Sequence, residues 1–175
     1  MVRNLLQENR LVEKKLPGKE WEHLLYDKQD RLVGTQDGLM RLANQWMFTK
    51  YDQFKRVVYT GVQIDSRTRV TLQNLIDTNT TNPQNNESRS TSPFAGSGLS
   101  VYYTNVAFPV ITTTTKLLSV NYYDTYPGAG EPFDNILGQS PAPALLTATY
   151  TTYGNTVRSL KGLLTASFIN NIEAN

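Results

Sequence analysis

The chain has 175 residues, which is enough for one domain with a hydrophobic core. A formal net charge of only +2 excludes the strong positive field that attracts nucleic acid. The absence of cysteine excludes disulfides and thiolate metal sites, and no apolar run reaches the length of a membrane span.

The first 17 residues are expected to be a leader or linker. Charged residues interrupt the stretch MVRNLLQENRLVEKKL throughout, so it does not have the apolar run of a signal peptide. Any export signal is therefore expected to lie outside this chain.

Residues 18–64 are predicted to form two β-hairpins with nearly the same spelling. YDKQDRL begins at Tyr26 and YDQFKRV begins at Tyr51. Each lies between two runs with strand character, 24–27 and 31–36 in the first case and 45–52 and 56–61 in the second. An aspartate can bond backbone N–H groups two residues on, so both segments favour a tight turn. Asp37-Gly38 predicts a further tight turn between the hairpins.

The rest of the chain changes in character. Apolar residues spaced by three and four predict a short helix over about 67–77, within a segment 65–79. Residues 80–98 are polar and are expected to be a loop. Residues 99–175 are expected to be rich in β structure, with strands over 99–110 and 116–124, the second ending in NYYD. The apolar final run could pair with strands that this chain does not contain.

The repeated spelling resembles the YD or Rhs repeat, in which Tyr-Asp and a following Arg-aliphatic pair lie between two strands. The residues that carry the resemblance are Tyr26, Asp27, Arg31, Tyr51, Asp52, Arg56, Gly61, Tyr123 and Asp124. The family has glycine directly before the arginine, whereas Asp30 and Lys55 stand there in this chain.

The resemblance implies a mainly β fold in which antiparallel hairpins wind into a spiralling sheet. In large bacterial members of this family the sheet closes into a shell around a toxin or effector domain. By that resemblance, the chain would be a non-catalytic internal or truncated segment of a secreted or cell-surface protein. Its partners would be the rest of the shell or the enclosed effector, with no cofactor, no nucleic acid and no membrane span.

Two other functions remain open from the residues alone. Seven of the ten tyrosines fall between Tyr102 and Tyr153, and such rings could line an adhesive or carbohydrate-binding face. A hydrolase could use two carboxylates such as Asp124 and Glu131, and with Asp134 the same loop could bind calcium. We favour solvated loop residues for these, and a structural role for His23, the only histidine. We therefore predict no catalytic residue and no metal site.

Overall fold

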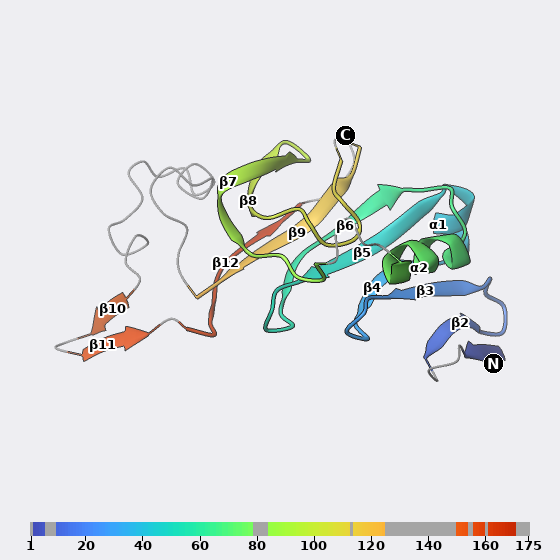
Figure 1. Ribbon diagram of the computed structural model, residues 1–175, viewed down its shortest axis with the longest axis horizontal. Helices are drawn as coiled ribbons and strands as arrows, with labels where there is room; N and C mark the ends of the chain where they lie inside the picture. Colours follow the sequence, from blue (N-terminus) through green and yellow to red (C-terminus); the bar gives the residue numbers. More distant parts are fainter. Residues whose placement is uncertain are drawn as a thin grey trace.

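The computed structural model describes residues 2–5, 10–78, 84–112, 114–124, 150–153, 156–159 and 161–170. The fold is mainly β, as predicted, and its main feature is one antiparallel sheet with the strand order β1-β2-β3-β4-β5-β6-β9-β12. Figure 1 shows this sheet as open, with β1 at one edge and β12 at the other. Its strands are β1 (Val2–Leu5), β2 (Leu11–Lys15), β3 (Glu22–Tyr26), β4 (Leu32–Gln36), β5 (Gln45–Tyr51), β6 (Val57–Ile64), β9 (Lys116–Tyr123) and β12 (Leu164–Ile169).

Four smaller strands and two helices complete the described structure. β7 (Arg89–Gly96) pairs with β8 (Leu99–Tyr103), and β10 (Tyr150–Tyr153) pairs with β11 (Thr156–Ser159). Helix α1 (Gly38–Leu42) joins β4 to β5, and α2 (Arg69–Thr78) follows β6. In the part of the chain that the structure describes, no helix combines the length and the apolar character needed to cross a bilayer.

The first six strands run as a meander, so that each strand pairs with the next one in the sequence. The chain then leaves the sheet through α2 and the β7–β8 hairpin, and returns as β9 beside β6. Such local pairing needs only short connections, which agrees with the hairpin spacing read from the sequence.

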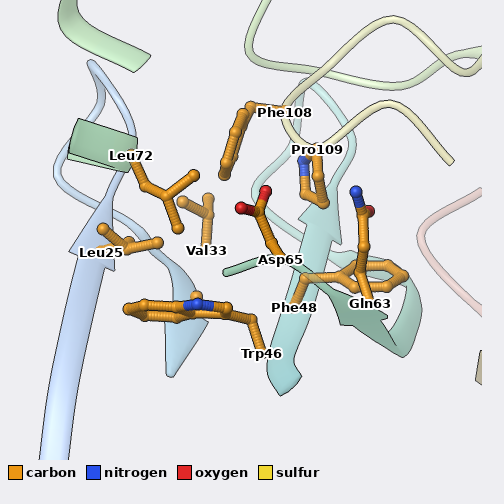
Figure 2. A pocket seen from close by; sticks show the side chains of 10 residues that line it. Leu25, Val33, Trp46, Phe48, Gln63, Asp65, Leu72, Phe108 and Pro109 are labelled. Carbon is orange, nitrogen blue, oxygen red and sulfur yellow. The ribbon is translucent and has the colours of Figure 1, made fainter. Parts of the chain in front are cut away.

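Two clusters of buried side chains form the core. The larger lies where β8 covers β5, β6 and β9, and it contains Phe48, Val58, Tyr59, Val101, Tyr103, Ile111, Leu117, Val120 and Tyr122. The smaller lies between α2 and β3 to β5 and contains Leu25, Val33, Trp46, Leu72 and Ile76. Figure 2 shows the small hollow beside this second cluster, with Trp46 on one side and Phe108 on the other. Its volume of about 20 Å³ is far below the size of a ligand pocket.

Several boundaries differ from the prediction. Residues 1–17 are not a linker, because β1 and β2 lie in the main sheet. Asp37-Gly38 is not a tight turn: the Asp37 side chain accepts from the N–H of Met40 and caps α1 instead, giving a second helix. Gly38 lies close to Glu20, where a Cβ would meet that side chain at 2.4 Å.

The second half shows further differences. The predicted loop over 80–98 contains strand β7, and the predicted strand over 99–110 ends at Tyr103. One side of the final run already has a partner, because β12 pairs with β9 of the same chain. The predicted helix is correct, since α2 covers Arg69–Thr78 and buries Leu72 and Ile76.

Candidate functional site: a ladder of tyrosine and arginine between hairpins

Asp27 and Asp52 close two turns of the same geometry. The N–H of each aspartate donates to the carbonyl of the arginine four residues on, at 3.0 Å in both turns. One carboxylate oxygen of each accepts the N–H groups two and four residues on, at 2.8 and 3.0 Å. The turns lie where the sequence predicts them, and the aspartate is the group that holds each one.

Asp30 and Lys55 occupy the position where the resembling family has glycine. Both adopt the left-handed conformation, with φ of 60° and 65°. That conformation costs a non-glycine residue about 1 kcal/mol, which the aspartate hydrogen bonds of the turn offset. Both turns therefore adopt the left-handed conformation without glycine.

The arginines pair with the aspartates of their own turns. Arg31 Nε lies 2.7 Å from Asp27 Oδ2, and Arg56 Nε lies 2.6 Å from Asp52 Oδ2. Arg56 also donates to both carboxylate oxygens of Asp124. These two hydrogen bonds lower the pKa of Asp124 to about 2 and raise the pKa of Arg56 above its ordinary value.

The motif tyrosines connect each hairpin to the preceding one. Each hydroxyl donates to the carbonyl of the residue that follows the arginine of the preceding hairpin. The pairs are Tyr26 with Leu11 at 2.8 Å, Tyr51 with Leu32 at 2.8 Å and Tyr123 with Val57 at 3.0 Å. We call these contacts, with the arginines that lie over the rings, the tyrosine–arginine ladder.

The arginines of the ladder lie over the same rings. The distances from guanidinium carbon to ring centroid are 5.6 Å for Arg10 and Tyr26, 4.8 Å for Arg31 and Tyr51 and 4.4 Å for Arg56 and Tyr123. A cation over an aromatic face gains from about 0.5 kcal/mol when exposed to about 2 kcal/mol when desolvated. The ladder thus repeats one pair of contacts three times along the sheet.

The sequence analysis did not identify the first contact of the ladder, which joins Tyr26 to Arg10 and Leu11 in the hairpin of β1 and β2. In the first hairpin Leu5 pairs with Leu11, and in the second Tyr26 pairs with Leu32. Both pairs join residues that are six positions apart in the sequence. A β-bulge precedes the pair in both hairpins. The first hairpin lacks Tyr-Asp, so only the dipeptide Arg10-Leu11 could have identified it.

The third turn is interrupted by residues 125–160. The N–H of Asp124 donates to Leu163 O at 3.1 Å, as the aspartates of the first two turns donate to their arginines. Tyr123 pairs with Leu164, and Gly162 has a φ of 85° at the position equivalent to Asp30. Asp124 itself has a φ of 71°, so the chain leaves the turn at this residue. NYYD is therefore the first half of a turn like those at Asp27 and Asp52, and its second half, with Gly162, follows at 161–163.

The polar segment 84–88 docks onto the first two turns. Arg31 donates to Asn85 O and to Asn86 Oδ1, and the N–H of Glu87 donates to Tyr51 O at 2.8 Å. Arg31 also reaches Asp52 O at 3.2 Å, so it joins both turns to this segment. The sequence predicted only an undefined polar loop here.

Lys50 and Glu87 form an ion pair in which both side chains are completely buried. Their Nζ and Oε1 atoms lie 2.8 Å apart. Burial lowers the pKa of Lys50 to about 8, although the Glu87 carboxylate opposes this shift. Alternation along β5 places Lys50 on the same face as Trp46 and Phe48, and all three are buried. That alternation was the only signal for a buried lysine, and no signal identified Glu87.

Gly61 has a packing role at the junction of β6 and β9. A Cβ there would lie 2.5 Å from Phe48 Cζ and 2.6 Å from the backbone oxygen of Lys116. The absence of a side chain therefore allows β9 to approach β6.

The other candidate residues that the structure describes do not form a reactive group. Burial lowers the pKa of His23, whose ring lies 6.4 Å from that of Trp46. Asp124 is engaged by Arg56, and Glu131 and Asp134 lie outside the described residues. No cluster of potential metal ligands occurs among the residues that the structure describes.

An open groove of about 560 Å³ lies beside α1. Leu39 and Leu42, both highly exposed, are its most accessible apolar residues. Its carboxylates are engaged: Glu20 and Glu22 pair with basic side chains, and Asp37 caps α1. The groove therefore does not present the free carboxylate pair that a hydrolase would need.

Comparisons with protein-family models, with curated proteins and with solved structures found no match for this chain. The resemblance to the YD repeat consequently stays a prediction.

Proposed function

We propose that this chain is a non-catalytic structural segment of an Rhs/YD-repeat protein, forming part of a β-shell that encloses or displays an effector or toxin domain. The observation that carries the proposal is the tyrosine–arginine ladder. It joins four successive hairpins of the main sheet by the same tyrosine hydroxyl and arginine contacts. Contacts that repeat between neighbouring units are the means by which stacked repeats build an extended surface.

The outer edge of the sheet supports continuation into a larger assembly. Within the described strands nothing pairs with the far side of β12, and Leu164 and Ile169 are 55% and 74% exposed there. An exposed apolar edge strand is a template for a further strand. In the proposed shell this edge would receive the next hairpin, and the sheet would curl as the family's spiral does.

The size and location of the native product test this proposal. An antiserum raised against this chain should detect, in the medium or at the cell surface, a protein much larger than the 19.7 kDa of the chain alone. A product of 19.7 kDa confined to the cytoplasm would overturn the proposal.

The isolated chain offers a second test. Its open edge should cause self-association that grows with concentration in size-exclusion chromatography with light scattering, and Ile169→Lys should reduce it. Leu42→Lys is the matched control, because Leu42 is 84% exposed but lies on α1. Equal self-association of both variants would contradict the assignment of β12 as the pairing edge.

The alternative of a tyrosine-rich glycan-binding face finds less support. Of the tyrosines in 102–124, Tyr103 and Tyr122 are buried in the core, and Tyr102 and Tyr123 are partly buried. A ring that stacks on sugar must be exposed, so these four residues do not offer such a face. The other tyrosines of the 102–153 region have side chains outside the described set.

A further inference from the structure

An amine, a carboxamide and a carboxylate meet beside the larger core cluster, against Tyr59 and Ile111. Lys50 Nζ lies 2.8 Å from Glu87 Oε1 and 3.1 Å from Asn105 Oδ1. Neither charged side chain has any exposed surface. The ring of Tyr59 lies 5.2 Å from Nζ and covers the group on one side. The three groups are thus held in contact, with Lys50 and Glu87 away from water and Asn105 partly buried, although they lie far apart in the sequence.

The Asn105 carboxamide is oriented by two hydrogen bonds to one residue. Its Oδ1 accepts the N–H of Ile111 at 2.8 Å, and its Nδ2 donates to Ile111 O at 2.9 Å. Oδ1 therefore receives two donors, Ile111 N–H and Lys50 Nζ. Donors at a carbonyl oxygen polarise its carbon and stabilise the oxyanion that forms when a nucleophile adds.

We propose that Lys50 and Asn105 join in an intramolecular isopeptide bond, with Glu87 as the proton carrier. Glu87 takes a proton from the Lys50 ammonium, and the neutral amine adds to Asn105 Cγ. A bond forms between Lys50 Nζ and Asn105 Cγ, and the oxyanion at Oδ1 accepts the hydrogen bond of the Ile111 N–H. The proton that Nζ loses on addition passes to Asn105 Nδ2. The bond between Cγ and Nδ2 then breaks and ammonia leaves. No oxidant, metal or co-reactant is needed, because amine plus carboxamide equals isopeptide plus ammonia.

The surroundings supply what this reaction requires. Fixing two reactants in contact raises their effective concentration by orders of magnitude. Burial lowers the pKa of Lys50 to about 8, so about one tenth of it is a neutral amine at pH 7. Glu87 is itself fixed, because it accepts the N–H groups of Val106 and Ala107. The bond would connect β5 to the segment after β8, and so clamp that segment onto the sheet.

The simpler interpretation is an ion pair that stays non-covalent. Lys50 Nζ has three acceptors, Glu87 Oε1, Asn105 Oδ1 and Ala107 O, which match the three protons of an ammonium. Both interpretations give the same contacts before reaction, but only the isopeptide changes the mass and the connectivity of the chain.

Intact mass spectrometry of the full chain under denaturing conditions separates the two. The isopeptide predicts a mass below that of the sequence by one ammonia molecule, and a branched peptide joining Lys50 to Asn105 in a protease digest. Lys50→Met and Glu87→Gln should restore the sequence mass, whereas the matched control Lys55→Met, at an exposed turn position, should keep the deficit. Because the first measurement uses the unchanged protein, poor folding of a variant does not affect it.

Two results would overturn the proposal. One is an intact mass equal to the sequence mass after prolonged incubation at pH 8. The other is a mass deficit accompanied by ordinary linear peptides around both Lys50 and Asn105, since ammonia would then have left from another site.

Discussion

Removing the turn aspartates should destabilise the two hairpins unequally. In the first turn, Asp27 is the one carboxylate paired with Arg31 among the described residues, and both side chains are almost fully buried. Asp27→Ala leaves a buried guanidinium without its counter-charge, which typically costs about 3–5 kcal/mol of unfolding free energy. In the second turn, Arg56 is 21% exposed and keeps its pair with Asp124. Asp52→Ala therefore loses mainly the turn hydrogen bonds, and should cost about 1.5–3 kcal/mol.

The assay is equilibrium unfolding in urea, followed by the fluorescence of Trp46, which is buried in the second core cluster. The comparison is valid if the slope m stays constant among variants. In an Asp124→Ala background, Asp52→Ala should cost more than it does alone, because Arg56 then has lost both carboxylates. Equal losses for the two single variants, or strict additivity in the double variant, would refute this reasoning.

Three further predictions concern the third turn and the junction of β6 and β9. Replacing residues 125–160 by a single lysine should give a five-residue turn like those at Asp27 and Asp52. The thermal midpoint of unfolding should then not fall by more than a few degrees. Loss of the cooperative unfolding transition would show that this turn is not equivalent to the other two. Because Arg56 holds the pKa of Asp124 at about 2, below its ordinary value, the pair stabilises the fold at neutral pH, and this contribution is lost as the pH falls from about 5 to about 1. The carboxylate is 35% exposed, so Asp124→Asn should remove less than about 1 kcal/mol at pH 7 and progressively less toward about pH 1, and a pH-independent loss would contradict the assignment. Gly61→Ala should cost about 1–3 kcal/mol in urea unfolding, because its Cβ would press on the backbone oxygen of Lys116; an unchanged midpoint would show that β9 can move away.

The turns at Asp27 and Asp52 were predictable because everything that forms them lies within five residues. The aspartate, the N–H groups it accepts and the paired arginine are all close in the sequence. The helix α2 was predictable for the same reason, since its apolar spacing is local. The resemblance to a repeat also rested on this short sequence motif. The hairpin of β1 and β2 was therefore not predicted, because it has no Tyr-Asp.

The burial of Lys50 and Glu87 could not be predicted from the residues near each of them in the sequence. A lysine in an alternating strand and a glutamate in a polar segment indicate solvent exposure by composition alone. Each becomes buried only because the fold brings the partner and further hydrogen-bond donors and acceptors to it. The same holds for Arg56 and Asp124, which lie 68 residues apart.

The sequence by itself determined that the chain turns at Asp27 and Asp52 and that α2 is a helix, because turn chemistry and apolar spacing act over a few residues. Only the tertiary structure decided which tyrosine meets which arginine and that residues 125–160 interrupt a turn rather than follow a strand. It also brought the amine of Lys50 to the carboxamide of Asn105. These outcomes depend on strand register and on the return of β9 to β6, and no short stretch of sequence contains either.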